Sequence, residues 1–301
     1  MDSTREMKRR VAIIGPTGML GSMLYKCLRE EYSLIIVYKD KVKLRKLEDA
    51  YGSFKGHKLV QFDIKELADN YLTGFSKFST SRAVDLKKQI GPIDKIINCA
   101  GIIKPYALKN PQLTYFVNSA FPHILSNLYG NKLIQITTDC VYDGLGQAPY
   151  DETSQYTPND LYGLTKSLGE PSKRSLVLRT SIIGPEINNG ISLLNWFLSQ
   201  KDVVTGYTNH KWNGVTTKEF ARICNKLIAD ENKFPQYGLF HIYSSDVTKY
   251  EMLLKFKKKY NHDVTVTKVR AAQPVDRRLI SKFNFVKKLS IPDFDQMLED
   301  L

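Results

Sequence analysis

The 301-residue sequence predicts an α/β fold, with a doubly wound parallel sheet and a smaller C-terminal α/β lobe. Three observations indicate this. Short apolar runs alternate with segments of helical spacing, a glycine-rich turn follows the first run, and the pattern changes after Gly184. Alternating strands and helices imply parallel strands joined by helical crossovers. We therefore expect a sheet domain over residues 1–184 and a smaller lobe over residues 185–301. The boundary is approximate, because such lobes take segments from several parts of a chain.

Six apolar runs predict the strands of the sheet. Each is rich in Val, Ile or Leu, is too short for a helix and is bounded by Gly, Pro or polar residues. Continuous apolar runs of this kind are typical of strands buried on both faces. The runs are Val11–Ile14, Leu34–Tyr38, Lys58–Phe62, Ile96–Asn98, Leu133–Thr137 and Leu176–Leu178.

Segments with helical spacing separate these runs. Leu20, Leu24 and Leu28 recur at intervals of four, and residues 114–129 carry apolar side chains at the same interval, as one face of a helix requires. After Gly184 the sequence predicts two further helices and one strand, at Ser192–Gln200, Thr217–Asp230 and Leu239–Tyr243.

The composition favours phosphate-bearing ligands over nucleic acid. There are 44 Lys and Arg against 31 Asp and Glu, which gives a formal net charge of +13 and suggests anionic partners. The lysines are dispersed, however. The densest group, Lys255–Lys259, alternates with apolar residues, which is typical of the solvated face of a helix. We therefore expect no nucleic-acid partner.

The four cysteines and the hydropathy pattern indicate a reduced, cytoplasmic protein. The cysteines are scattered without a paired motif, so neither a disulfide framework nor a metal site is expected. No apolar run approaches the roughly 18 residues that span a bilayer, and the polar N-terminus does not resemble a signal peptide. We expect no membrane contact, and a homodimer is left open.

The turn from Gly15 to Gly21 predicts a dinucleotide-binding site. Its three glycines, at intervals of three, follow a strand and precede a helix. Such glycines permit a tight turn, a close approach of the backbone to pyrophosphate and close packing of helix on strand, and the helix N-terminus offers N–H donors to phosphate. The candidate cofactor contacts in this turn are Gly15, Thr17, Gly18, Met19 and Leu20.

Residues at the ends of the following strands favour NADP, with NAD left open. Lys39 stands where an NAD enzyme places an acid for the ribose hydroxyls, although a slip of one residue would return Asp40 to that position. Asp63, followed by Ile64, ends the third strand, where a carboxylate can accept from adenine. Its alternative role is a helix N-cap. Small residues at the end of the fourth strand let a cofactor pass closely; they are Cys99, Ala100 and Gly101.

Tyr162 and Lys166 are the strongest candidates for catalysis. A spacing of four places both side chains on one face of a helix. A phenol has a pKa near 10, and an ammonium beside it lowers that pKa and allows proton exchange near neutrality. Thr138 and Asp139 follow the fifth strand, at the sheet edge where such folds bind ligands. Thr138 can hydrogen-bond a substrate carbonyl beside Tyr162.

Five segments together resemble the extended short-chain dehydrogenases/reductases, and within that class the dTDP-4-dehydrorhamnose reductase family. They occur in the order and spacing of that class. The resemblance covers residues 11–184 well and the remainder of the chain loosely. The segments are Gly15–Gly21, Asn98–Gly101, Thr137–Gly144, Tyr162–Glu170 and Leu178–Gly184.

The resemblance implies a Rossmann domain that binds NAD(P)H and reduces the 4-keto group of a nucleotide-diphosphate sugar, for deoxysugar or polysaccharide synthesis. It assigns the catalytic triad to Thr138, Tyr162 and Lys166, with Tyr162 as general acid and Lys166 on the ribose. It also matches Asn118 to the structural asparagine of the class.

The substrate side departs from the family pattern. Cys140 stands where the family has an aromatic residue, and the C-terminal Arg-Pro signature is altered around Arg278. Arg278 remains a candidate for the diphosphate, and Trp212 is a candidate for stacking on base or sugar or, alternatively, a core aromatic. Two other functions stay open: a nucleotide-sugar 4-epimerase and a non-catalytic, cofactor-binding regulatory subunit.

Overall fold

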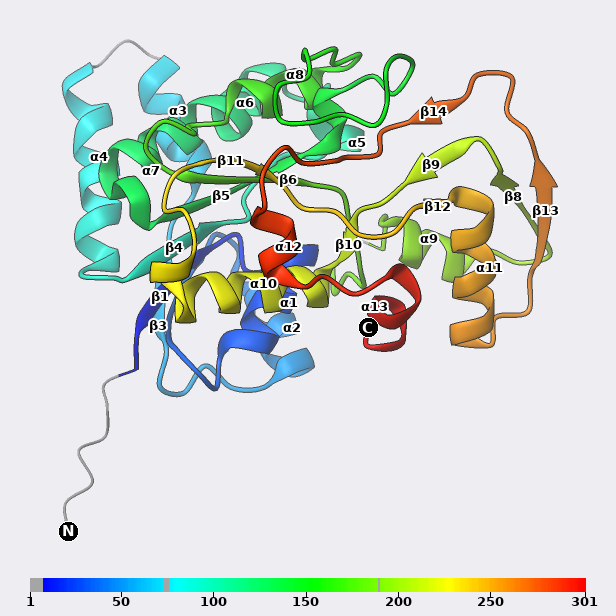
Figure 1. Ribbon diagram of the computed structural model, residues 1–301. Coiled ribbons are helices and arrows are strands. Elements are labelled where there is room, and N and C mark those ends of the chain that lie inside the picture. The colour runs from blue at the N-terminus through cyan, green and yellow to red at the C-terminus, as the bar shows by residue number, and fades with distance from the viewer. Residues whose placement is uncertain (1–7, 73–75, 189) are drawn as a thin grey trace.

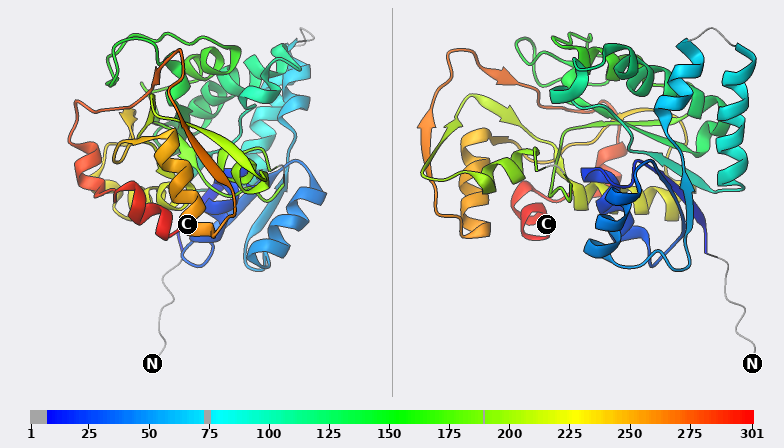
Figure 2. Two further views of the ribbon diagram at one scale, coloured as in Figure 1. Left: turned by 90° about the vertical axis from the view of Figure 1, so that its right-hand side faces the viewer. Right: turned by 180° about the vertical axis from the view of Figure 1, so that it is seen from behind.

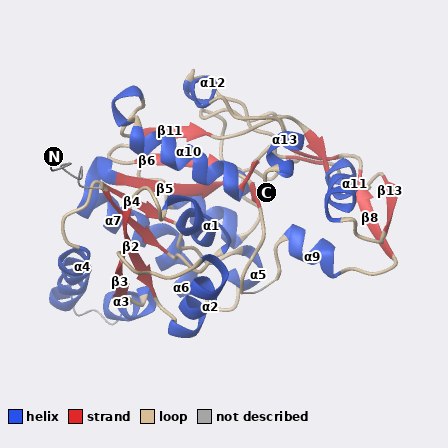
Figure 3. Ribbon diagram, turned by 90° about the horizontal axis from the view of Figure 1, so that it is seen from below, coloured by secondary structure: helices blue, strands red, loops and turns tan. Residues whose placement is uncertain are grey.

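A seven-stranded parallel sheet forms the centre of the molecule. The computed structural model describes residues 8–72, 76–188 and 190–301. The strands lie in the order β11-β6-β5-β4-β1-β2-β3 (Figures 1 and 3), and every pairing between neighbours is parallel. Their bounds are β1 Arg10–Ile14, β2 Ser33–Tyr38, β3 Lys58–Gln61, β4 Lys95–Asn98, β5 Leu133–Thr138, β6 Leu176–Thr180 and β11 Gly238–His241. The six predicted runs are therefore strands of the sheet.

Helices cover both faces of the sheet (Figure 1). One face carries α1 Met19–Leu28, α2 Lys41–Tyr51 and α10 Thr217–Ala229. The other carries α3 Ile64–Leu72, α4 Ser76–Ile90, α7 Phe121–Tyr129 and α8 Leu161–Leu168. Short helical segments join these elements: α5 Lys104–Ala107, α6 Pro111–Tyr115, a π-helical turn at Phe116–Ala120, and 3-10 turns at Gly130–Lys132, Asp139–Val141 and Glu231–Lys233. The arrangement is the predicted doubly wound sheet.

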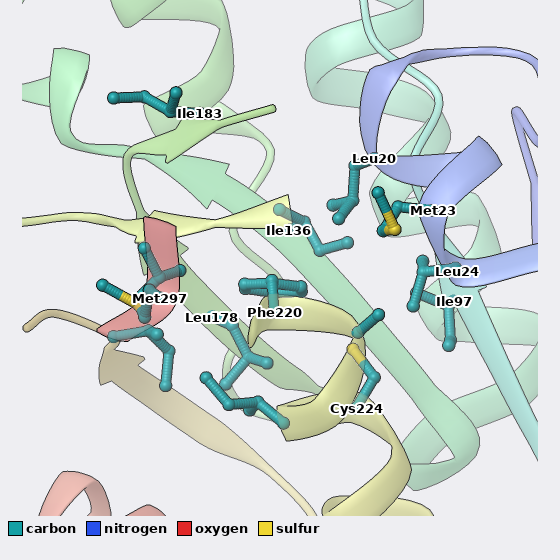
Figure 4. Close-up of a cluster of buried hydrophobic side chains, with 14 of the residues drawn as sticks. Leu20, Met23, Leu24, Ile97, Ile136, Leu178, Ile183, Phe220, Cys224 and Met297 are labelled. Carbon is teal, nitrogen blue, oxygen red and sulfur yellow. The ribbon is translucent and has the colours of Figure 1, made fainter. Parts of the chain in front are cut away.

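The main apolar core lies between the sheet and α1 and α10. Phe220 and Cys224 of α10 face Leu20 and Leu24 of α1, and strand residues such as Ile136 close the cluster from the sheet (Figure 4). All five side chains are buried. Burial of this extent stabilises by roughly 1.5–3 kcal/mol for each large aliphatic or aromatic side chain, so α10 is held firmly against the first βα unit.

A smaller lobe extends from one end of the sheet (Figures 1 and 2). It contains a parallel pair, β8 Val203–Tyr207 and β13 Thr265–Val269, and a three-stranded sheet of β9 His210–Trp212, β12 Val247–Thr248 and β14 Val275–Asp276. Helices α9 Leu193–Ser199 and α11 Lys249–Tyr260 pack on it, and β7 Ile182–Ile183 pairs with β10 Val215–Thr216 where the chain enters and leaves it. Two short helices end the chain, α12 Phe285–Leu289 and α13 Phe294–Glu299.

The segment beyond Gly184 contributes to both parts of the molecule. The chain enters the lobe after β7, returns through α10 and β11 to the main sheet, and re-enters the lobe at β12. The helix predicted at residues 217–230 and the strand predicted at 239–243 are thus elements of the sheet domain. Their apolar faces, including Phe220, Ile223 and Phe240, are buried in its core.

No helix among the residues that the structure describes is long and apolar enough to cross a membrane.

Candidate active site

The glycine-rich turn has the geometry of a phosphate cradle. Gly15 adopts a φ of +76°, and a Cβ there would lie 2.9 Å from the Ala100 nitrogen at the end of the neighbouring β4. A Cβ on Gly21 would lie 2.1 Å from the Gly15 carbonyl oxygen. Helix α1 begins at Met19, and no side chain in the described part of the chain caps it at Gly18. The N–H groups of its first turn are therefore oriented toward the mouth of the sheet for an anion.

The predicted contacts in this turn differ in which atoms they present. The side chain of Leu20 is buried in the core at 6% exposure (Figure 4), so only its backbone faces the turn. Thr17 and Met19 are half-buried. The Thr17 carbonyl accepts a hydrogen bond of 2.9 Å from the Asn188 side chain, which belongs to the loop after β7. Sequence reasoning missed Asn188, because no local pattern reports a contact across 171 residues.

The ends of β2 and β3 line a polar cavity on the side where a dinucleotide would place its adenosine. The Lys39 ammonium lies 3.0 Å from Asp63, whose other oxygen accepts from the Lys65 N–H at 2.9 Å. Asp40 instead caps α2 by accepting from the backbone of Val42 and Lys43, and the pKa of its carboxyl is lowered, first by the bond from Lys43. Lys39 and Arg82 are the cationic side chains on the cavity, beside the acids Asp40, Asp63, Glu66 and Asp85. The lining residues are Lys39, Asp40, Gln61, Phe62, Asp63, Glu66, Arg82, Asp85 and Gln89.

Thr138 lies at the carboxyl end of β5, opposite Thr180 of β6. Its hydroxyl donates to the Asp139 carboxylate at 3.1 Å and accepts from the Cys140 N–H at 3.2 Å. Burial raises the pKa of the neighbouring Tyr162 phenol, and the Thr138 hydroxyl opposes that rise. The predicted pair Thr138 and Tyr162 is therefore together at the edge of the sheet.

Helix α8 brings Tyr162 and Lys166 to this edge. Asp160 caps the helix by accepting from the Gly163 N–H at 2.7 Å. Gly163 has no Cβ, which allows contact with the preceding turn, because a Cβ there would lie 2.1 Å from the Cys140 carbonyl oxygen. The Lys166 ammonium donates to the Ile136 carbonyl of β5 at 2.6 Å. Both side chains of the motif thus face the sheet.

Burial dominates the protonation of both groups. It raises the pKa of the Tyr162 phenol well above its ordinary value, and the negative charge of nearby Asp139 acts in the same direction while the hydrogen bond with Thr138 opposes it. Burial also lowers the pKa of the Lys166 ammonium to about 8, while attraction to Glu170 opposes that change. In the free protein Tyr162 is therefore a protonated acid, and the expectation that Lys166 lowers the pKa of the phenol was wrong, because burial is the dominant effect. Lys166 exchanges its proton near pH 8.

Asn118 ties the end of β4 to α8. It lies in the π-helical turn and is 1% exposed. Its side chain accepts from the Ile102 N–H at 2.8 Å, donates to the Ile102 carbonyl at 2.9 Å and donates to the Thr165 hydroxyl at 3.1 Å. The loop that contains Ala100 and Gly101 is thereby fixed against the helix of Tyr162. This geometry is the structural role that the resemblance implied.

The substrate-side candidates are placed differently from the prediction. Trp212 is a core aromatic, 5% exposed, with its ring 5.5 Å from that of Phe294 at 78°. The Arg278 guanidinium is bound by the carboxylates of Asp276 and Asp246.

Arg277 and Lys249 approach the catalytic edge instead. The Arg277 guanidinium donates to the Tyr142 carbonyl at 2.9 Å and lies 4.0 Å from the Cys140 sulfur. Asp139, whose pKa burial raises, is attracted to both Arg277 and Lys249. Lys249 carried no sequence signal, because it comes from α11 of the small lobe and its charge acts on Asp139 only in the folded chain.

Curated proteins match part of the chain in sequence. The chain is 25% identical to the dTDP-4-dehydrorhamnose reductase of Salmonella typhimurium over 166 residues. These residues make up 52% of this chain and 56% of that protein. The alignment thus spans about half the length of this curated relative.

Solved structures share the fold over nearly the whole chain. The dTDP-4-dehydrorhamnose reductase of Bacillus anthracis, solved with NADP, is 23% identical with a TM-score of 0.71, over 99% of this chain and 98% of that one. A UDP-N-acetylglucosamine 4-epimerase from Methanobrevibacter ruminantium is 16% identical with a TM-score of 0.70. The match covers 98% of this chain and 97% of that one. The family model of the RmlD substrate binding domain matches residues 9–284, so the chain belongs to this family.

Proposed function

We propose that the protein is an NADPH-dependent reductase of the 4-keto group of a nucleotide-diphosphate sugar. The observation that carries the proposal is the meeting of Thr138, Tyr162 and Lys166 at the sheet edge that also holds the phosphate-binding turn. The names of the relatives support the same reaction class. The residues of the turn fit a dinucleotide, because Gly15 and Gly21 allow the tight turn and the close packing of α1 on it, while a Cβ at Gly18 would meet only the Gly15 carbonyl oxygen at 3.7 Å, so the backbone there is open to a pyrophosphate.

The side chains of the site divide the reaction between them. Bound NADPH supplies the hydride that reduces the sugar carbonyl. Tyr162, kept protonated by burial, donates its proton to the carbonyl oxygen as that oxygen gains negative charge. Thr138 orients the phenol and the substrate oxygen. Lys166, held at Ile136, would hold the ribose next to the nicotinamide and, as a cation, would favour the phenolate left after proton transfer.

The cavity at the adenosine end supports NADP over NAD. Asp40, the acid that would bind ribose hydroxyls, is occupied in capping α2. Lys39 lines the cavity with its side chain 62% exposed and its ammonium paired with Asp63. A 2′-phosphate would compete with Asp63 for that ammonium and add a charge-assisted hydrogen bond.

The test is NADPH oxidation with a panel of nucleotide 4-keto sugars, for wild type and for Tyr162→Phe. We expect turnover of at least one sugar by wild type and a loss of about 100-fold or more in kcat for the variant, since general acid catalysis contributes typically 10²–10⁴-fold. NADPH affinity should change little. Wild-type protein that binds NADPH tightly and reduces none of the sugars contradicts the proposal and favours a regulatory subunit.

A 4-epimerase is the second candidate, because a structural neighbour with this fold has that activity in its name. It would use the same three side chains, retain NAD and show no net consumption of cofactor. Net NADPH oxidation in the assay above separates the two functions.

A further inference from the structure

One hydrogen bond joins the segment that enters the small lobe to the phosphate-binding turn. The Asn188 side chain donates to the Thr17 carbonyl at 2.9 Å. Residues 184–188 follow β7, where the chain passes from the sheet domain into the small lobe. The turn is therefore held from outside its own strand and helix, by a part of the chain that belongs to the other half of the molecule.

The contact fixes the peptide between Thr17 and Gly18 at both of its ends. Its carbonyl accepts from Asn188, and its N–H donates to the Gly15 carbonyl at 3.3 Å. Helix α1 begins at the next residue, and the Ser22 N–H donates to the Gly18 carbonyl at 2.9 Å. The N–H groups that precede Ser22 in this first turn have no helical carbonyl to bind. Their direction follows from the peptide that Asn188 holds.

The amide of Asn188 makes this contact at a cost. A backbone carbonyl can only accept, so the atom that faces Thr17 is the Nδ2 donor, and the orientation of the amide is determined. Oδ1 is then buried, and among the described residues it has no hydrogen-bond partner. An unpaired buried acceptor costs free energy, so the hydrogen bonding of the amide itself does not explain this orientation. Its one gain is the link to the turn.

The segment that carries Asn188 is fastened to the small lobe at helix α9. The Glu186 carboxylate accepts from the N–H groups of Ile191 at 2.8 Å and Ser192 at 3.0 Å. The Glu186 N–H donates to the side chain of Asn195 at 3.0 Å, and Ser192 caps α9. Asn188 lies two residues beyond this anchor, so its position depends on the small lobe.

We propose that Asn188 is a positioning residue for the cofactor, which holds the turn in the form whose N–H groups bind a pyrophosphate. A small-lobe segment thereby becomes part of the cofactor site. The inference rests on the proposed function for the identity of the ligand, a dinucleotide, and adds a residue to its site. Because the contact is a neutral hydrogen bond to a backbone carbonyl of the turn, its loss should weaken cofactor binding and leave proton transfer at Tyr162 intact.

The test measures the affinity of wild type, Asn188→Ala and Asn188→Asp by calorimetry. The probes are NADPH, adenosine 2′-phosphate 5′-diphosphate, which keeps the pyrophosphate, and adenosine 2′-phosphate, which has no group to reach the turn. Asn232→Ala, at an exposed asparagine, is the matched control. Amide hydrogen exchange of residues 15–21 in the protein without cofactor reports on the turn itself. Asn188→Ser replaces either variant that does not fold.

We expect Asn188→Ala to weaken both pyrophosphate-bearing probes by about threefold to tenfold, which corresponds to one neutral hydrogen bond. Adenosine 2′-phosphate should bind as it does to wild type. Asn188→Asp should lose at least as much as Asn188→Ala, because a carboxylate cannot donate to the Thr17 carbonyl. Exchange in the turn should be faster in both variants. The KM for NADPH should rise, while kcat at saturating NADPH stays that of wild type.

Three results would overturn the role of Asn188 and leave the proposed function standing. They are wild-type affinity of Asn188→Ala for both pyrophosphate-bearing probes, an equal loss for adenosine 2′-phosphate, and an equal loss in Asn232→Ala. A wild type that reduces no keto sugar, together with the expected losses in the Asn188 variants, contradicts the proposed function alone.

Discussion

At the scale of single residues, the chemistry depends on where burial places the protons of Tyr162 and Lys166. An acid must carry its proton at working pH, and the raised pKa of the Tyr162 phenol ensures this. An amine that binds an anionic cofactor must be protonated. Because the pKa of Lys166 is lowered to about 8, the loss of its proton falls close to physiological pH. The two shifts give cofactor binding a measurable pH dependence.

We expect NADPH to bind more weakly as pH rises through about 8. The free protein loses the Lys166 proton near that pH, whereas the bound, negatively charged cofactor favours the protonated amine and raises its pKa. Proton uptake then accompanies binding, so the Kd increases by at most about tenfold for each pH unit above the free-state pKa. Fluorescence titration of NADPH between pH 6 and 9.5 measures this. In Lys166→Met, the Kd for NADPH should no longer rise above about pH 8. A rise that persists in the variant assigns the titration to another group.

Adjacent arginines show what the sequence could not decide at this scale. Side chains alternate in direction along extended backbone. Because β14 ends at Asp276, the sequence does not specify whether Arg277 or Arg278 faces the site. We predicted Arg278 as a substrate contact, and the fold places Arg277 nearest Cys140 and binds Arg278 to Asp246 and Asp276. The common face of Tyr162 and Lys166 was easier to predict, since their spacing within one helix, α8, fixes it.

At the scale of elements, the close packing of α8 on the turn after β5 sets the distance between the tyrosine and the threonine. Gly163 makes this packing possible, because its position has no room for a Cβ beside the Cys140 carbonyl. Asn118 holds the same helix from the other side through Thr165. The orientation of Tyr162 is therefore a property of three elements, α8, the 3-10 turn at Asp139–Val141 and the π-helical turn.

Gly163→Ala should move α8 and impair turnover far more than cofactor binding. A Cβ at 2.1 Å from a backbone oxygen must displace the helix or the turn, and a misplacement of about 1 Å can cost roughly 10²-fold in rate. Steady-state kinetics with NADPH affinity as the control measures the separation. Gly146→Ala is a suitable comparison, because its Cβ would meet only the Tyr150 hydroxyl at 3.9 Å. Unchanged kcat in Gly163→Ala would show that the helix position is not critical.

The order of the elements was only partly predictable. Local periodicity specified the first six strands and the helix at α10, because apolar patterns report burial. It could not specify that β11 pairs with β6, because the intervening chain passes through the small lobe and strand partners are chosen by tertiary packing.

At the scale of the whole molecule, a buried ion pair within the sheet domain joins β6 to the segment after α8. Arg179 of β6 is fully buried and contacts Glu170, which follows α8, at 2.6 Å. Its guanidinium also bonds the Tyr142 and Tyr156 hydroxyls at 2.6 Å each. His241 of β11, whose pKa burial and Arg179 lower to about 4, stays neutral and can accept from Arg179.

This network holds the segments that carry the site in one arrangement. His241 bonds the Ile280 carbonyl through its other nitrogen at 2.8 Å, which anchors the chain just after Arg277 and Arg278. Glu170 also attracts the Lys166 ammonium. Removing one partner of such a buried pair typically costs about 3–5 kcal/mol, so the network holds the end of α8, β6, β11 and the segment at Ile280 together.

The most direct measurement of the central claim is transfer of isotope from cofactor to sugar. The protein is incubated with a nucleotide 4-keto sugar and NADPH deuterated at both C4 positions of the nicotinamide ring, and the product is analysed by mass spectrometry. We expect a 4-hydroxy sugar that carries one deuterium at C4, formed at the rate of NADPH oxidation and reduced about 100-fold or more in Tyr162→Phe. A product without deuterium, or equal labelling rates in wild type and variant, would contradict hydride transfer assisted by this tyrosine.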